Sequence, residues 1–292
     1  MTFQPVRKAV LPVAGMGTRF LPATKAVPKE MLPVVDKPVV QYAVEEAREA
    51  GIEQFIFVTG RGKHVIEDHF DHAYELESLL LDRDKTKELD SLLEGLPDTG
   101  SVSFTRQQKP LGLGHAVWSA RHLVGDEPFA VLLPDDLLVG KPGALAQMME
   151  IYKQAGGGVV VAAEEKPREE TKRYGVIDPG KSIGRATEVK GVVEKPDPDK
   201  APSTLCIIGR YILQPAIFAE LDRKEKGAGG EIQLTDSMAK LIGHMPFHAV
   251  TTTCARYDCG DKVGFLQANI AVGLSRPDIA PPLKAMLKTL KF

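Results

Sequence analysis

The sequence predicts an α/β fold in which a parallel sheet carries helices on both faces. Short apolar runs alternate with segments of helical spacing through the first half of the chain. The runs are nearly continuous in apolar residues, as in strands buried on both sides. With 292 residues, 43% of them hydrophobic, the chain can bury a large core as one domain over residues 1–292, without disulfides or metals.

The elements can be assigned in order along the chain. Apolar runs predict strands at 8–13, 54–59, 102–107, 129–133, 158–163 and 205–211. Helical spacing predicts helices at 38–50, 112–123, 143–154, 232–242 and 261–274, of which the first ends at Gly51. Residues 64–95 are polar and of mixed charge, which indicates a solvated helical hairpin with His64, His69 and His72 at its surface.

The end of the chain, from about residue 275 to 292, differs in character from the preceding helices. A Pro-rich stretch leads into a short basic amphipathic segment over 283–292. Its apolar residues have the spacing of one helix face; they are Leu283, Met286, Leu287 and Leu290. Such a face can pack on its own domain or against a second copy, and the sequence leaves both open.

Composition excludes several classes of protein. A net charge of −2 provides no basic field for nucleic acid or an anionic membrane. The three cysteines, Cys206, Cys254 and Cys259, are odd in number and contain no C-x-x-C pair, so we expect small buried thiols. Residues 1–8 lack the pattern of a signal peptide, and no run of about 18 apolar residues occurs. We therefore expect a cytoplasmic protein without a membrane partner.

A glycine-containing loop directly follows the first predicted strand. It reads Ala14-Gly15-Met16-Gly17-Thr18-Arg19, and its glycines let backbone N–H groups approach phosphate oxygens. Arg19 adds a bidentate phosphate donor, and Lys29 adds a point charge. By itself G-x-G fits a plain strand-to-helix turn equally well. A dinucleotide fingerprint would need glycine at position 20, where Phe20 stands, which disfavours a nicotinamide dehydrogenase. The Walker pattern of a second class of phosphate loop is also absent.

Ordered motifs extend this loop into a resemblance that covers nearly the whole chain. Residues 11–19, with Pro28-Lys29-Glu30-Met31-Leu32-Pro33, resemble the signature of the sugar nucleotidyltransferases, and are most similar to its bacterial UTP–glucose-1-phosphate uridylyltransferases. Further matches follow in order at 107, 111–116, 133–136, 174–177, 194–196, 209–211, 231–236 and 257–260. The resemblance implies a Rossmann-like nucleotidyltransferase fold, with a mixed, mostly parallel central sheet flanked by helices.

The resemblance also implies an activity and a set of nucleotide contacts. The uridylyl group of UTP would pass to glucose 1-phosphate, which gives UDP-glucose and pyrophosphate. The nucleotide-binding residues would be Ala14, Gly15, Gly17, Thr18, Glu30, Gln107 and Gly112. For Gln107 the chemistry is clear, because a carboxamide offers both a donor and an acceptor to the imide edge of uracil.

Two aspartates are the implied metal ligands. Asp135 follows a predicted buried strand and Asp258 precedes Gly260, and Mg²⁺ usually takes one or two carboxylates together with substrate phosphates. Each aspartate taken alone would also fit a helix cap or a turn.

The sugar side is implied by a third group of residues. It comprises Asp136, Tyr174, Gly175, Glu194 and Thr204, with Arg210 as a further contact, although the family often has Asn where Thr204 stands. Lys195 would hold the phosphate of the sugar. Without the resemblance, the pair formed by Glu194 and Lys195 would fit an ordinary surface ion pair.

The implied chemistry needs positive charge more than it needs a general base. The second pKa of a phosphate monoester is about 6, so its oxygen is already anionic at neutral pH. Arg19, Lys29 and Lys195, with Mg²⁺, would reduce repulsion between two anions during in-line attack on the α-phosphorus of UTP. No covalent intermediate is expected.

Two alternatives remain open at this stage. Another base or sugar is compatible with the same motifs, as in a thymidylyltransferase, because one methyl group is worth only about 1–3 kcal/mol of discrimination. A non-catalytic nucleotide-sugar-binding protein should have lost some charged residues of the site. All five are present: Arg19, Lys29, Asp135, Lys195 and Asp258. The resemblance further implies a homodimer or homotetramer.

Overall fold

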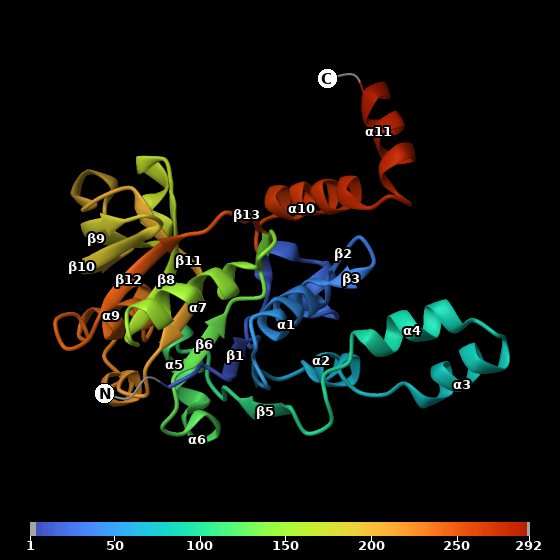
Figure 1. Ribbon diagram of the computed structural model, residues 1–292, viewed down its shortest axis with the longest axis horizontal. Helices are drawn as coiled ribbons and strands as arrows, with labels where there is room; N and C mark the ends of the chain where they lie inside the picture. Colours follow the sequence, from blue (N-terminus) through green and yellow to red (C-terminus); the bar gives the residue numbers. More distant parts are fainter. Residues whose placement is uncertain (1–3, 291–292) are drawn as a thin grey trace.

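The computed structural model describes residues 4–290, and within them nine strands form one sheet. The order across the sheet is β5-β4-β1-β6-β11-β8-β12-β10-β9. The strands are β1 (Lys8–Pro12), β4 (Gln54–Thr59), β5 (Val102–Arg106), β6 (Phe129–Leu132), β8 (Val159–Glu165), β9 (Gly175–Ile183), β10 (Ala186–Glu194), β11 (Leu205–Leu213) and β12 (Phe247–Thr251). Figure 1 shows this sheet running through the body of the molecule.

Strand directions follow from the pairings. β5, β4, β1 and β6 pair in parallel, and β8 pairs in parallel with β12. β11 is antiparallel to both β6 and β8, and β10 is antiparallel to both β12 and β9. All strands of this sheet except β11 and β10 therefore run in one direction. The prediction of a mixed, mostly parallel sheet is confirmed.

The sheet separates two apolar cores. In β1, Val10 joins one core while Ala9 and Leu11 join the other, because successive side chains of a strand point to opposite faces. Helices that contribute buried residues to the core of Val10 are α5 (Leu113–Ser119), α6 (Arg121–Val124), α8 (Ile217–Asp222) and α9 (Leu234–Ala239). Those on the other face are α1 (Val39–Glu49), α2 (His64–His69) and α7 (Ala144–Gln154). Helices on both faces were predicted, and the structure confirms them.

Some element boundaries differ from prediction. The helix expected at 112–123 is divided into α5 and α6 at Ala120, and the one expected at 232–242 is shortened to α9. Two short strands, β7 (Asp136–Val139) and β13 (Ala255–Asp258), pair antiparallel outside the main sheet and were not predicted. Each has only four residues and depends on a partner that is distant in the sequence, so local pattern carries no signal for them.

A helical hairpin and a terminal helix project from the body (Figure 1). The hairpin consists of α3 (Tyr74–Asp82) and α4 (Thr86–Glu94), neither of which has a buried residue. The solvated hairpin predicted over 64–95 is therefore confirmed only for these two helices, since α2 at its start buries Ile66 in the core. His64 and His72 are exposed, but His69 is half-buried, with its Nε2 2.9 Å from Gln41 Oε1. The prediction of surface histidines therefore holds for two of the three.

The terminal segment consists of α10 (Lys262–Ser275) followed by α11 (Ala280–Thr289). α11 begins before the predicted residue 283, because its prolines stand in the first turn, where no backbone donor is needed. Leu283 packs toward Gly273 of α10, whereas Met286 and Leu290 are 47% and 48% exposed. Residues 291–292 of the predicted tail lie outside the described part of the chain.

Two composition-based expectations can also be compared with the structure. None of the described helices has the length and apolar character needed to cross a membrane. All three cysteines are free; Cys206 and Cys259 are buried as expected, whereas Cys254 is half-buried.

Candidate active site

A cavity of about 490 Å³ lies beyond the carboxyl end of β6, and it is also bordered by β7, by β13 and by the paired residues Gly175 of β9 and Glu194 of β10. This is the edge at which open α/β sheets generally bind ligands. Eight of the predicted site residues line it, namely Arg19, Asp135, Asp136, Tyr174, Gly175, Glu194, Lys195 and Asp258. The folded chain thus brings together residues from segments that are far apart in the sequence.

The two predicted metal ligands border one small space. β7 pairs with β13 so that Asp136 lies opposite Asp258, and the Cys259 N–H donates to the carbonyl of Asp135 at 2.7 Å. A side-chain carbon at Gly260 would lie 2.8 Å from Asp135 Oδ2 and 3.1 Å from Asp258 Oδ1. Glycine therefore keeps open the space that both carboxylates face.

This donor set fits Mg²⁺. Among residues 4–290 no group of three or more His, Cys, Asp or Glu side chains is arranged to hold a metal ion. The pair formed by Asp135 and Asp258 matches an ion that takes one or two carboxylates and completes its shell with phosphate oxygens.

Cationic side chains lie beside both carboxylates. Lys29 Nζ is 2.6 Å from Asp135 Oδ2, and Arg173 Nη2 is 3.3 Å from Asp258 Oδ2. Arg19 Nη1 donates to the Gly260 carbonyl at 3.4 Å. Burial acts to raise the pKa of the Asp135 carboxyl, but Lys29, together with a backbone hydrogen bond and Arg19, outweighs burial and lowers the pKa. Asp135 is therefore held as a carboxylate.

The glycine-containing loop packs against Lys29. A side-chain carbon at Gly15 would lie 3.6 Å from Lys29 Cε, and one at Gly17 would lie 3.0 Å from Lys29 Cβ. Gly17 has a φ of 64°, a left-handed conformation that glycine adopts without strain. Ala14 is half-buried at the start of the loop, and Thr18 is exposed after it. The loop and Lys29 form one surface, as the phosphate-binding prediction requires.

Gln107 and Glu30, two of the residues predicted to bind the nucleotide, differ in whether a side-chain oxygen remains available to a ligand. Gln107 Nε2 donates to the Gly112 carbonyl at 3.0 Å, and Gln107 Oε1 accepts no hydrogen bond from the described residues. Its amide is thus held by the nitrogen and keeps a free acceptor. Glu30, by contrast, is 2% exposed, and its Oε2 is 2.7 Å from Lys63 Nζ. That oxygen is bound within the protein and is not offered to a ligand.

Lys195 is fixed at the end of β10 by an unusual backbone conformation. Gly175 of β9 pairs with Glu194 of β10, and the Lys195 N–H donates to the Tyr174 carbonyl at 2.9 Å. Lys195 has a φ of 47°, which is rare for a residue other than glycine, and such strain often accompanies function. Its Nζ is 3.3 Å from Glu194 Oε1, and the side chain is 41% exposed. The ammonium therefore faces the cavity with room to reach a ligand.

Two residues named for the sugar side lie elsewhere. Thr204, directly before β11, does not line this cavity, and its hydroxyl donates to Glu165 Oε2. The expectation for Arg210 is wrong, because its side chain turns to the opposite face of β11, where it is 1% exposed and paired with Glu46 of α1. Alternate residues of a strand point to opposite faces, and Gly209 rather than Arg210 borders the cavity.

Arg256 is a charged residue of the cavity that sequence reasoning missed. It is nearly buried and forms an ion pair with Asp136 Oδ1, while Asp136 Oδ2 accepts from the Gly209 N–H at 2.9 Å. Burial acts to raise the pKa of Asp136 and exceeds the opposing effect of Arg256. The position of Arg256 could have predicted its place in the cavity, because it lies two residues before Asp258 on one strand, and alternate residues of a strand share a face.

Residues 8–273 match the nucleotidyl transferase family. The chain belongs to the nucleotidyl transferase family. It is 53% identical over 260 residues to a UTP–glucose-1-phosphate uridylyltransferase of Komagataeibacter xylinus, covering 89% of this chain and 91% of the relative. The family predicted from the sequence motifs is therefore confirmed.

Solved structures of nucleotidyl transferases agree with this assignment. UTP-bound UGPase from Acinetobacter baumannii is 41% identical, with a TM-score of 0.90 over 98% of this chain and all of that one. A UDP-glucose pyrophosphorylase complexed with UDP-glucose is 42% identical, with a TM-score of 0.83 over 93% of this chain and all of that one. The predicted nucleotidyltransferase fold is confirmed.

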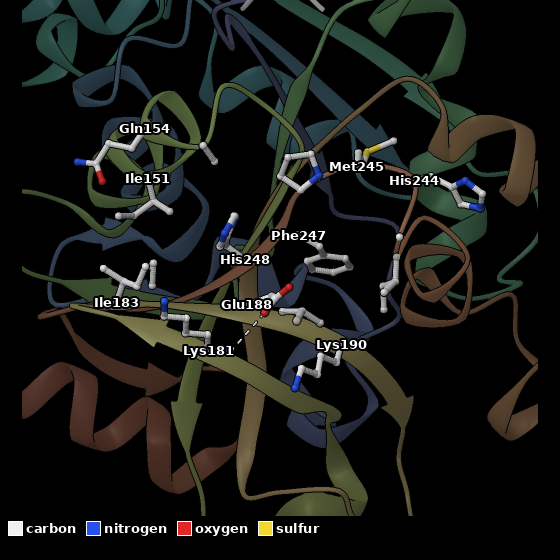
Figure 2. A pocket seen from close by; sticks show the side chains of 16 residues that line it. Ile151, Gln154, Lys181, Ile183, Glu188, Lys190, His244, Met245, Phe247 and His248 are labelled. Carbon is white, nitrogen blue, oxygen red and sulfur yellow. Dashed lines mark hydrogen bonds between the residues drawn. The ribbon is translucent and has the colours of Figure 1, made fainter.

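This nucleotidyl transferase has a second, larger cavity of about 790 Å³ that contains none of the predicted site residues. Figure 2 shows its lining, in which Lys181, Glu188 and Lys190 lie opposite the end of α7 and close to Phe247 and His248. Cavity volume alone would therefore not select the smaller cavity. The ordered motifs and the paired carboxylates identify the smaller one as the candidate active site.

Proposed function

We propose that this chain transfers the uridylyl group of UTP to glucose 1-phosphate and releases pyrophosphate and UDP-glucose. The relatives that share about half of its residues carry the name of this activity, in agreement with the sequence-based prediction. The observation that carries the proposal is the single space shared by Asp135 and Asp258, with Lys29 and Arg19 beside it. Lys195 lines the same cavity.

UTP would occupy the side of the loop at Gly15 and Gly17. The free Oε1 of Gln107 would accept from the uracil imide N–H, while Gly112, bonded to the same amide, limits the room around the base. The triphosphate would then lie along the loop N–H groups toward Arg19 and Lys29. These two cations would stabilise the charge that develops on the departing pyrophosphate.

Glucose 1-phosphate would occupy the side of β9 and β10. Gly175 and Glu194, paired across these strands, would hold sugar hydroxyls, with Asp136 and Tyr174 beside them. Lys195 would bind the phosphate and bring its oxygen in line with the α-phosphorus of UTP. Because that oxygen is already anionic near neutral pH, no side chain has to remove a proton.

Asp135 and Asp258 would hold Mg²⁺ in this site. When bound, the ion supplies charge neutralisation for the phosphates of both substrates. Lys29 would then interact with phosphate oxygens as well as with Asp135, because an ammonium has three donors.

A pyrophosphate-release assay tests the activity. The protein is incubated with Mg²⁺, glucose 1-phosphate and either UTP or dTTP, and other sugar 1-phosphates are compared in parallel. Release that requires glucose 1-phosphate and is fastest with UTP supports the proposal. Faster release with dTTP would indicate the thymidylyltransferase alternative, and nucleotide-sugar binding without release would indicate a non-catalytic protein.

We further propose that the protein acts in the cytoplasm as a homodimer or homotetramer. The feature that supports association is the pair of exposed apolar side chains Met286 of α11 and Leu290 directly after this helix. Light scattering of the wild type and of a Met286→Lys, Leu290→Lys variant tests this, since a monomeric wild type would contradict it.

A further inference from the structure

A buried ion pair lies directly behind the loop that carries the metal-site aspartate. Arg210 of β11 and Glu46 of α1 are 1% and 7% exposed. The Arg210 Nε donates to both carboxylate oxygens of Glu46 at 3.1 Å, and Nη2 donates to Oε2 at 2.7 Å. Such a bidentate geometry fixes the guanidinium in orientation as well as in position.

The other end of the guanidinium holds the loop after β6. Arg210 Nη1 donates to the Leu133 carbonyl at 3.0 Å and to the Gly209 carbonyl at 2.9 Å. The same Leu133 carbonyl accepts from the Asp136 N–H at 3.1 Å, and the Leu133 N–H donates to Gly209 at 2.9 Å. Asp135 therefore lies between two residues whose backbone is fixed by this network.

Glycine at 209 allows the close approach on which the network depends. A side-chain carbon there would lie 2.6 Å from Asp136 Oδ2 and 2.9 Å from Leu133 Cβ. The Gly209 N–H instead donates to Asp136 Oδ2 at 2.9 Å. Strand β11 thus holds the loop from both its backbone and the Arg210 side chain.

Glu46 also connects the loop to a helix beyond it. Its Oε1 accepts a hydrogen bond at 3.0 Å from the N–H of Leu145, in the first turn of α7. The N-cap residue of α7 is Gly143, which has no side chain to cap the helix itself. A carboxylate at a helix N-terminus is favourable there. The carboxylate of Glu46 therefore connects α1, β11 and α7.

We propose that Glu46 and Arg210 are positioning residues that set the place of Asp135, and with it the geometry of the metal site and the attack on UTP. Neither side chain lines the cavity, so neither touches substrate. A buried ion pair contributes little net stability compared with apolar residues of the same volume, which leaves the orientation of the loop as its main effect. The inference rests on the proposed function for its catalytic consequence.

The test uses Glu46→Gln, which keeps the shape of the side chain and removes its charge. We expect kcat to fall at least tenfold and the Mg²⁺ concentration for half-maximal rate to rise at least threefold. The KM for UTP should stay within twofold of wild type. In the protein without substrates or metal, hydrogen exchange at the amides of Leu133, Asp136 and Gly209 should accelerate at least tenfold relative to those of β4.

A matched control separates positioning from general loss of stability. Gln147→Leu removes a different buried polar side chain, which belongs to α7. The Gln147 Oε1 accepts from Arg185 Nη1 at 2.6 Å and from the Thr253 N–H at 3.1 Å. This substitution should lower the unfolding temperature without changing the Mg²⁺ dependence or the exchange of the Leu133 loop. If Glu46→Gln behaves as this control does, the proposal is overturned.

Two further arms keep the test decisive. If Glu46→Gln does not fold, Glu46→Asp is used in its place, because aspartate keeps the charge but is one methylene shorter. A raised Mg²⁺ requirement with faster exchange supports the proposal, and behaviour like that of Gln147→Leu overturns it. If the wild type releases no pyrophosphate, the proposed function fails. The hydrogen-exchange comparison still decides whether the pair holds the loop, because it needs no substrate.

Discussion

Lys29 Nζ lies 2.6 Å from Asp135 Oδ2 and joins the half of the site proposed to bind phosphate to the half proposed to bind metal. Burial acts to lower the pKa of Lys29, but the charges of Asp135 and Glu30 outweigh it and raise the pKa. Lys29 is therefore protonated at neutral pH. An uncharged amine could not offset the negative charge of a triphosphate. Charge balance around Asp135 is the property that several substitutions should disturb.

Asp135→Asn should weaken the binding of the Mg²⁺ on which the rate depends. The site keeps Asp258 but loses one of two carboxylates, so the half-saturating Mg²⁺ concentration should rise by about tenfold or more. A Mg²⁺ titration of initial rate measures this. Asp126→Asn, an exposed change in the turn between α6 and β6, serves as the control. An unchanged titration for Asp135→Asn would remove this residue from the metal site.

Lys195→Ala should reduce turnover and glucose 1-phosphate binding while UTP binding survives. The lysine lies at the end of β10 beside Glu194, on the side assigned to the sugar phosphate. Loss of one preorganised cation should lower kcat by about 100- to 1,000-fold. Steady-state kinetics and calorimetric UTP titration measure the two effects. Lys200→Ala, whose side chain is exposed in a surface pair, should match wild type. Equal loss of UTP affinity contradicts the assignment.

Gly260→Ala should damage the site while the fold survives. The new methyl carbon would lie 2.8 Å from Asp135 Oδ2 and would push the two carboxylates apart. A misplacement of about 1 Å can cost about 100-fold in rate. We therefore expect kcat to fall by about that factor, with a far-ultraviolet circular dichroism spectrum like that of wild type. Full activity in this variant would show that the space between the carboxylates is not used.

Lys63→Met should destabilise the protein through Glu30. Both side chains of this pair are buried, and removal of one partner from a buried pair costs about 3–5 kcal/mol. Burial already raises the pKa of the Glu30 carboxyl despite the presence of Lys63. Urea unfolding measures the loss. Lys85→Met, which breaks an exposed pair with Glu88 at the start of α4, should cost less than about 1 kcal/mol. A loss for Lys63→Met no larger than this control would contradict the expectation.

The sequence predicts those parts of the fold that depend on local pattern. The run 54–59 is confirmed as β4 with the same bounds, because five of its six residues are buried and the signal lies in the strand itself. The paired strands β7 and β13 leave no comparable trace, since they are short and each depends on the other. Yet this pairing is what places Asp258 beside the loop of Asp135.

The direction in which a side chain points decides which of the predicted site residues line the cavity. Lys195 and Glu194 belong to a motif at a strand end, and both line the cavity. Arg210 belongs to a motif of the same quality, but it lies within a strand, where a shift of one residue exchanges the faces. Alternation holds along β11, with Ile207 and Tyr211 in one core and Ile208 and Ile212 in the other, so Arg210 lies on the face away from the cavity.

A crystal structure of this protein with UDP-glucose and Mg²⁺ tests the central claim most directly. The account predicts the glucose-bearing phosphate within hydrogen-bond distance of Lys195 Nζ, the uracil edge at Gln107, and the cation between Asp135 and Asp258. Phosphates bound away from these side chains, or a ligand in the larger cavity lined by Phe247 and His248, would contradict it.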